Sequence, residues 1–346
     1  MDLAGLLAEL ESRRTAALAR AISLVENARP GFERLLAALH PRLGRARRVG
    51  MTGPPGAGKS TLTQQLVQHW RGRGLTVAVV AVDPTSPASG GALLGDRIRM
   101  EAVALDEGVY IRSMATRGSL GGLATSTREV CDVLDAFGFD RVLIETVGVG
   151  QSELAVTTMA DSTVLVLVPE SGDGIQALKS GVMELADIFC VNKADRPGAA
   201  NLAREIEITQ AIRRGNAFRG MRAHHGGADG RRGRGAEGQS PTSVSWEPPV
   251  ILTTATTGSG IPELEDALER HHAWMEQQGE LAARRRRRFA ARTREVVDRT
   301  MHRWIWNETR AEELLGERIE EVAEGKLSPY DLANEIVMGI KEGARV

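Results

Sequence analysis

The sequence contains little cysteine and no long apolar run. Of its 346 residues only Cys131 and Cys190 are cysteines, and neither stands in a metal-ligand spacing. We interpret both as buried, inert thiols in a reducing cytosol. The longest aliphatic runs, such as residues 164–168, are far too short to cross a bilayer. These features predict a soluble cytoplasmic protein with no membrane-spanning segment.

The sequence also lacks an excess of charge of one sign. The formal net charge is −1 at pH 7, so the chain offers no broad cationic surface, and we expect neither a nucleic-acid nor a membrane partner. Charged side chains at Glu9, Glu11, Arg13 and Arg14 interrupt the first apolar stretch, which is not typical of a signal peptide. Binding is therefore expected at a local site.

A phosphate-binding loop is present at residues 53–61. Its letters GPPGAGKST fit the spacing G-x-x-x-x-G-K-[ST] that wraps a nucleoside triphosphate. Glycines let backbone N–H groups turn toward the phosphates, Lys59 neutralises their charge, and the Ser60 hydroxyl can hold Mg²⁺. The predicted phosphate-site residues are Gly53, Pro55, Gly56, Ala57, Gly58, Lys59, Ser60 and Thr61.

The context of this loop favours nucleotide binding over a chance glycine turn. Residues 48–51 read as a short strand, and Leu62, Leu66, Val67 and Trp70 form a helical stripe after the loop. The phosphates would then lie at a helix N-terminus, where the dipole and free N–H groups favour an anion.

Two apolar strands end in carboxylates. Residues 76–82 lead to Asp83, and residues 140–144 lead to Glu145, with Gly148 shortly after. Ligands collect at this edge of an open α/β sheet. In P-loop hydrolases a carboxylate at a strand end supports Mg²⁺, and a glycine N–H can sense the γ-phosphate. We therefore predict that Glu145 supports Mg²⁺ together with Ser60, and that Asp83 lies at the same ligand-binding edge.

A late strand, residues 188–191, delivers the tetrapeptide Asn192-Lys193-Ala194-Asp195. The aspartate can accept two hydrogen bonds from the guanine amino group and ring N–H, whereas adenine presents the wrong pattern. Asn192 would brace the loop, and the stem of Lys193 would lie along the base. Together with the phosphate loop, this motif favours GTP over ATP.

Strands alternate with helices along the chain, which predicts an α/β fold with a doubly wound, mostly parallel P-loop NTPase sheet. Helices are predicted at residues 2–28 and 31–40 before the sheet, and further helices after it, the last at 331–342 behind a Ser328 cap. We divide the chain into an N-terminal helical extension (1–45), a nucleotide domain (46–278) and a C-terminal helical dimerisation region (279–346).

Two segments are rich in arginine. Residues 215–245 combine glycine and arginine with almost no aliphatic side chains, and are interpreted as a disordered surface insertion rather than an RNA-binding segment. The run Arg284–Arg288 could touch phosphate, but a solvated helix face is the preferred interpretation.

Taken together, these motifs resemble the MeaB/ArgK family of P-loop GTPases. The resemblance lies in the phosphate loop, residues 83–86, residues 90–100, the segment Glu145–Glu153 and the Asn192–Asp195 tetrapeptide. It implies a homodimeric GTPase that chaperones adenosylcobalamin-dependent methylmalonyl-CoA mutase, gating cofactor loading and protecting the mutase from inactivation.

The resemblance also implies roles for single residues. Lys59 would act on the phosphates, Asp83 and Glu145 would be catalytic and hold Mg²⁺ with Ser60, and Asp96 would lie in a switch near the γ-phosphate. The last base-contacting loop would include Thr254 and Ala255, where the family usually reads Ser-Ala-Leu and this chain reads Thr-Ala-Thr. Residues 169–179 resemble a further switch toward the mutase.

Other functions remain open at this point. One is a nickel-delivery metallochaperone GTPase, although the phosphate-loop region lacks His- or Cys-rich ligands. Another is an ATP-dependent kinase of amino-acid transport, which Asp195 disfavours. A third is a GTP-gated scaffold in which hydrolysis is incidental.

Overall fold

The computed structural model describes residues 2–83, 100–115, 120–146, 152–169, 183–184, 186–213 and 245–341. The chain divides into two compact units, Met1–Leu281 and Ala282–Val346. Among the described helices, none is both long and apolar enough to cross a membrane. Residues 215–244 of the insertion predicted at 215–245, residues 170–179 of the further switch, Asp96 and Gly148 lie outside the described residues.

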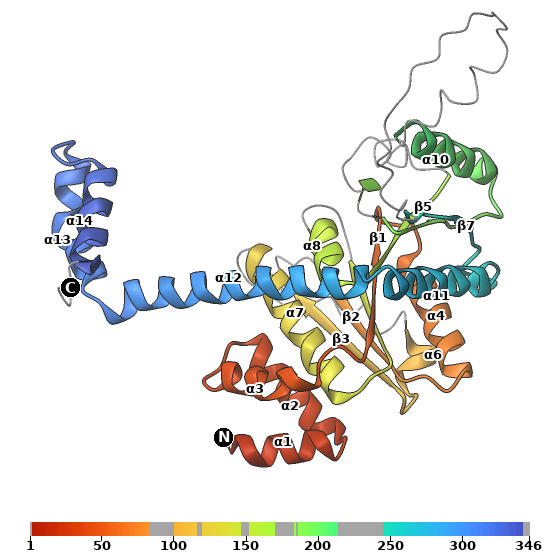
Figure 1. The fold of residues 1–346 in the computed structure, drawn as a ribbon, viewed down its shortest axis with the longest axis horizontal. Coiled ribbons are helices and arrows are strands. Elements are labelled where there is room, and N and C mark those ends of the chain that lie inside the picture. The colour runs from red at the N-terminus through yellow and green to blue at the C-terminus, as the bar shows by residue number, and fades with distance from the viewer. Residues whose placement is uncertain are drawn as a thin grey trace, which may run out of the picture. The chain divides into compact units, whose positions relative to one another are not determined.

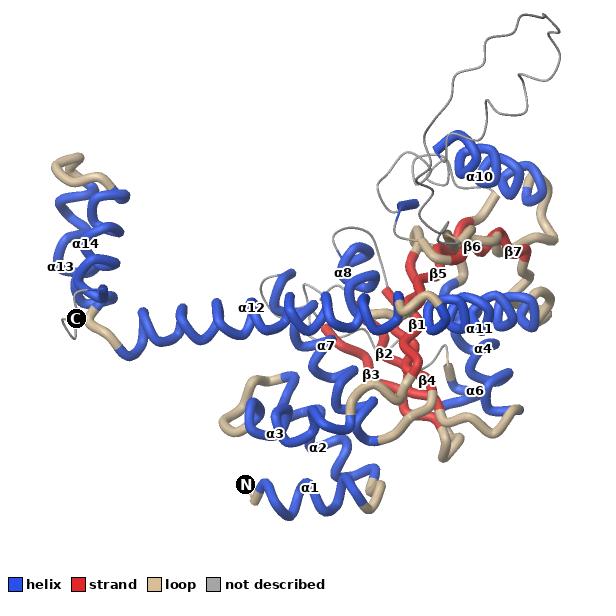
Figure 2. Tube along the Cα trace, in the orientation of Figure 1, coloured by secondary structure: helices blue, strands red, loops and turns tan. Residues whose placement is uncertain are grey.

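A parallel sheet forms the centre of the first unit (Figures 1 and 2). Its described strands follow the order β3-β2-β4-β1-β5-β6-β7, and each neighbouring pair runs parallel. The predicted doubly wound fold is therefore confirmed. The strands are β1 (Arg47–Thr52), β2 (Val77–Asp83), β3 (Val109–Ala115), β4 (Arg141–Thr146), β5 (Ser162–Leu167), β6 (Ile188–Val191) and β7 (Val250–Leu252).

Helices cover both faces of the sheet, so the central strands are apolar on both sides. One face packs against α7 (Leu120–Phe137), α8 (Ser152–Met159) and α10 (Ala199–Arg213). The helices α1 (Leu3–Glu11), α2 (Thr15–Glu26) and α3 (Phe32–Leu39) belong to the same buried cluster, and α2 and α3 pack on α7. The other face packs against α4 (Lys59–Gly72), α6 (Glu101–Ala104) and α11 (Ile261–Gln277). A 3₁₀ turn, η1 (His40–Arg42), leads from α3 to the linker before β1.

A glycine in β1 brings α8 close to the sheet. A Cβ atom built on Gly50 would lie 2.5 Å from Cγ1 of Val156 and 3.0 Å from Cβ of Ala160. Because any side chain would push α8 away, glycine at this position lets the helix pack directly on the strand that leads into the phosphate loop.

The prediction of one helix over residues 2–28 is wrong. The structure has two helices separated at Ser12, where Arg13 adopts a left-handed conformation with φ of 52°. The apolar spacing from Leu10 to Ala17 equals two helical turns, so the periodicity continues across the break and hides it. The break lets α1 pack against α2 and bury Leu10 in the same core.

The second unit contains α12 (Glu280–Glu308) from Ala282 onward, α13 (Ala311–Ala323) and α14 (Pro329–Lys341). Ala311, Leu332 and Ile336 form its small buried core. The hydroxyl of Ser328 accepts a hydrogen bond from the backbone N–H of Asp331 at 3.1 Å, so the predicted cap of the last helix is present.

The linker before β1 is held by one buried carboxylate. Asp135 of α7 is 1% exposed and accepts hydrogen bonds from the backbone N–H groups of Gly44, Arg45 and Ala46 at 2.9–3.1 Å. It also pairs with Arg48 of β1 at 3.0 Å. This carboxylate therefore fixes where the chain enters the sheet.

Replacing Asp135 by alanine should lower the free energy of unfolding by about 2–4 kcal/mol, because buried Arg48 then keeps only Asp132 as a carboxylate partner and the buried N–H of Ala46 loses its acceptor. Urea unfolding measures the loss. The control is Asp266→Ala, whose side chain is 67% exposed and pairs with Arg270 of the same helix. Equal stability of the two variants would contradict the role of Asp135.

Candidate functional site

The phosphate loop joins the end of β1 to the start of α4, and two of its glycines are required by close contacts. A Cβ atom on Gly53, where φ is 138°, would lie 2.1 Å from the carbonyl oxygen of Val166. On Gly58, where φ is 87°, it would lie 2.4 Å from Nδ2 of Asn192. Larger residues cannot occupy these positions without moving the neighbouring strands.

Lys59, the first residue of α4, lies within the loop. Its side chain is buried, and Nζ donates hydrogen bonds to the carbonyl oxygens of Gly53 and Pro54 at 2.7 and 3.0 Å. The ammonium group therefore lies beside the backbone N–H groups that open the helix, where an anion is favoured.

Ser60 and Glu145 meet at the predicted magnesium site. The Ser60 hydroxyl donates to Oε1 of Glu145 at 2.5 Å, and Glu145 is 1% exposed at the end of β4. A buried carboxylate and a hydroxyl at a helix N-terminus are oxygen donors that suit Mg²⁺. Asp83 ends the neighbouring strand β2, in register one residue beyond the Val82–Thr146 pair, so its backbone reaches the same edge. Its side chain is outside the described structure.

Asn192 connects the phosphate loop to the loop expected to contact the base. Its Nδ2 donates to the carbonyl oxygen of Ala57 at 2.8 Å. Its Oδ1 accepts from the backbone N–H of Ala255 and from the hydroxyl of Thr253, both at 3.1 Å. Asn192 is 2% exposed, so these bonds are shielded from water.

Two further residues of the tetrapeptide form the turn after β6. Lys193 has a positive φ of 57°, which turns the chain sharply after β6, and Asp195 is exposed beyond that turn. Thr254 continues the base-contacting loop and pairs with Ser259 through an isolated bridge. The described structure thus brings together Lys59, Ser60, Glu145, Asn192 and Ala255, while Asp96 and Gly148 lie outside it.

Sequence reasoning did not identify Thr253 as part of the site. This residue is fully buried, and besides its bond to Asn192 its hydroxyl lies 3.2 Å from Sγ of Cys190. A polar residue at the end of an otherwise apolar strand is the signal that could have indicated it.

Comparison with known proteins agrees with this geometry. Residues 18–310 match the family model described as methylmalonyl Co-A mutase-associated GTPase MeaB. A putative GTPase of Pyrococcus horikoshii is 44% identical over 292 residues, which cover 84% of each chain. The mouse protein named methylmalonic aciduria type A homolog, mitochondrial, is 37% identical over 265 residues, covering 75% of this chain and 54% of the mouse protein.

A solved structure is also similar. The chain titled LAO/AO transport system kinase aligns with a TM-score of 0.64 and 26% identity, covering 98% of this chain and 97% of that one. The fold, the phosphate loop and the relatives define the class as a P-loop GTPase, an enzyme that hydrolyses GTP. The chain belongs to the MeaB family of these GTPases, as the resemblance in its motifs predicted.

Both cysteines should be unreactive in the native protein. Each is buried, and burial raises the pKa of the Cys190 thiol to about 12, although the hydrogen bond with Thr253 opposes this shift. Because the thiolate is the reactive form, Ellman's reagent at pH 8 should label neither thiol before denaturation and both afterward. Rapid labelling of Cys190 in folded protein would contradict the described burial.

The variant Asp195→Asn should shift the base preference from guanine to xanthine. The carboxylate can accept from the N–H groups of guanine, whereas an amide can donate to the C2 carbonyl of xanthine. Competition binding should show the GTP-to-XTP preference falling by roughly 10- to 100-fold. The control is Asp266→Asn on the exposed side of α11, and an unchanged preference in Asp195→Asn would exclude this residue from base recognition.

Proposed function

We propose that this protein is a magnesium-dependent GTPase that chaperones adenosylcobalamin-dependent methylmalonyl-CoA mutase, gating cofactor loading and protecting the mutase from inactivation. The observation that carries this proposal is the match of residues 18–310 to a family described as mutase-associated. The name of the mouse relative, which refers to methylmalonic aciduria, supports the same client.

The chemistry proposed is in-line attack of water on the γ-phosphate of GTP. Bound Mg²⁺ would neutralise charge on the phosphates, and Ser60, Asp83 and Glu145 are the residues that would hold it. Lys59 would exchange its contacts with Gly53 and Pro54 for phosphate oxygens, and the N–H groups at the start of α4 would bind the same oxygens. Positioning and charge neutralisation would supply most of the rate enhancement.

Hydrolysis by the protein alone is expected to be slow. No glutamine directly follows Gly148 to orient the attacking water, in contrast to GTPases that use one. Under this proposal, the mutase would order the segments around the γ-phosphate and so raise the rate.

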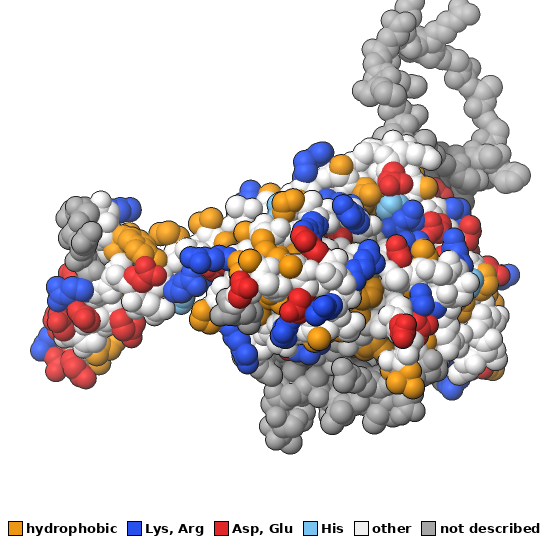
Figure 3. Space-filling view, turned by 90° about the horizontal axis from the view of Figure 1, so that it is seen from below, with side chains coloured by type: hydrophobic (Ala, Val, Ile, Leu, Met, Phe, Trp, Pro, Cys, Tyr) orange, Lys and Arg blue, Asp and Glu red, His pale blue; other side chains and the backbone are white. Residues whose placement is uncertain are grey.

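We further propose a homodimer formed through the second unit. Its described surface exposes Val297, Met301 and Trp304 on α12, with exposed fractions of 53%, 44% and 37%. Their spacing of four and three residues places them on one helix face. Figure 3 shows a group of hydrophobic side chains on this unit, with Lys, Arg, Asp and Glu side chains beside it. A second copy of the same helix would bury such a face.

The proposal predicts a slow basal GTPase rate that rises when methylmalonyl-CoA mutase is added. Phosphate release is measured with and without the mutase, with EDTA as the control for the metal. A fast rate that the mutase does not change would contradict the proposed function.

The variant Lys59→Ala separates hydrolysis from protection. Under the proposal it should lose GTP hydrolysis and also fail to protect the mutase during turnover. If it still protects the mutase, the protein acts as a scaffold and hydrolysis is incidental.

A further inference from the structure

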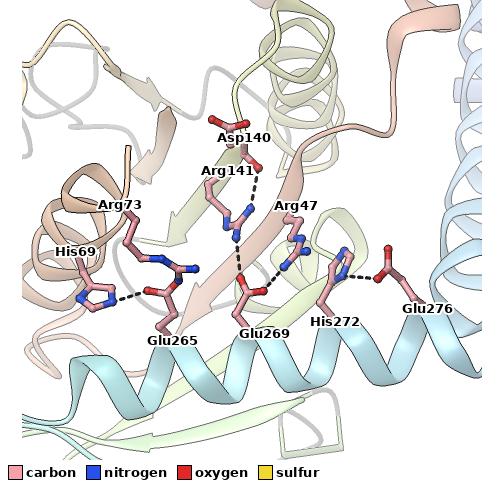
Figure 4. Close-up of polar contacts among 9 residues, drawn as sticks. All are labelled: Arg47, His69, Arg73, Asp140, Arg141, Glu265, Glu269, His272 and Glu276. Carbon is pink, nitrogen blue, oxygen red and sulfur yellow. Dashed lines mark hydrogen bonds and ion pairs between the residues drawn. The ribbon is translucent and has the colours of Figure 1, made fainter. Parts of the chain in front are cut away.

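Helix α11 carries a row of ionisable side chains along one face (Figure 4). Glu265, Glu269, His272 and Glu276 follow one another at intervals of four, three and four residues, which is the spacing of a single helix face. The first two reach other elements of the first unit, whereas His272 and Glu276 contact each other at 3.4 Å within the helix.

Glu265 holds the end of α4. Its side chain is 4% exposed, and Oε2 lies 2.8 Å from Nε2 of His69. Arg73, which caps α4, forms a hydrogen-bonded ion pair with Oε1 of the same carboxylate. One nearly buried carboxylate therefore contacts two side chains from the last turn of the phosphate-loop helix.

Glu269 holds the starts of β1 and β4. One oxygen pairs with Arg47 and the other accepts from Nη2 of Arg141 at 2.7 Å. Burial alone would raise the pKa of Glu269, but the hydrogen bonds and charges of the two arginines outweigh it and lower the pKa. Arg141 also lies over the ring of Trp70 in α4, 5.9 Å from its centroid. We call these contacts of Glu265 and Glu269 the α11 clasp.

The clasp joins elements whose other ends form the nucleotide site. β1 runs from Arg47 into the phosphate loop, and α4 begins in that loop at Lys59. α11 begins after Gly260, where the base-contacting loop ends, and a Cβ atom on Gly260 would lie 2.1 Å from the carbonyl oxygen of Leu252. The start of α11 is thus packed against the end of β7, and a shift of α11 would move the base-contacting loop.

A nucleotide contacts both loops at once, so its affinity depends on how well their separation matches the ligand. Once one part of the nucleotide is bound, the linked second part is held near its own loop at a high effective concentration. This advantage is lost if the two loops are at the wrong distance from each other. We propose that Glu265 and Glu269 are positioning residues that set the distance between the phosphate loop and the base-contacting loop. This proposal rests on the nucleotide site described above and concerns residues remote from it.

The test compares a whole nucleotide with its two halves. Glu265→Gln and Glu269→Gln should each raise the Kd for GDP roughly five- to tenfold, because the linked contacts no longer fit together. The Kd values for guanosine and for magnesium pyrophosphate should change by less than about twofold, because each contacts one loop. Competition against a fluorescent guanine nucleotide measures all three ligands.

The matched control is Glu276→Gln, which lies on the same face but contacts His272 of its own helix, and it should leave all three Kd values unchanged. Arg47→Gln removes the ion pair with Glu269 by changing the arginine instead of the carboxylate. It should likewise raise the Kd for GDP and leave the Kd values for guanosine and magnesium pyrophosphate nearly unchanged. This second variant keeps the test valid if Glu269→Gln does not fold.

Two outcomes would overturn the proposal. One is an unchanged Kd for GDP in folded clasp variants. The other is an equal loss for GDP, guanosine and pyrophosphate, which would indicate general destabilisation. A failure of the nucleotide site itself would be distinguishable, because the wild-type protein would then bind no GDP.

Discussion

The side-chain amide of Asn192 holds together the two loops of the candidate nucleotide site. Asn192 directly follows β6, and through one donor and one acceptor its amide connects the backbone of the phosphate loop to the backbone of the loop expected to contact the base. Both partners are backbone groups, so one side chain joins the main chains of two loops that are far apart in the sequence. Because the amide is buried, breaking either bond would leave polar groups without water.

The sheet imposes a similar constraint on a larger scale. Its parallel strands all deliver their ends to one edge, where Ser60 meets Glu145 and where Asn192 begins its loop. The opposite edge of β1 and β4 carries the arginines that pair with α11. The candidate nucleotide site thus lies at the carboxyl ends of the strands, and the ion pairs between the strands and α11 lie at the amino ends. α4 and α11 run between the two ends.

Much of this arrangement could be predicted from the sequence because its signals are local. The phosphate loop has a fixed spacing of glycines with Lys59 and Ser60, and the buried strands appear as runs of β-branched residues. The strands expected at residues 48–51, 76–82, 140–144 and 188–191 are all present among the described residues. The candidate site residues Asn192 and Asp195 could be named because their motif directly follows such a strand.

The rest could not be predicted because it depends on contacts between distant segments. Glu269 and Arg47 form an ion pair although they are 222 positions apart in the sequence. Nothing in the residues around either one indicates the other as its partner. The break at Arg13 was hidden because the apolar period continues across it. The role of Thr253 follows from the position of its hydroxyl between Cys190 and Asn192, which only the packed structure provides.

The first three helices share their core with the sheet, and this affects how far the chain can be shortened. Leu18 and Ile22 of α2 belong to the same buried cluster as Val130 and Leu134 of α7. A truncated protein starting at residue 46 would therefore expose a continuous apolar surface on α7, and such surfaces promote aggregation. The smallest form of this enzyme that folds on its own therefore has to retain α1, α2 and α3, although none of them contributes a candidate site residue.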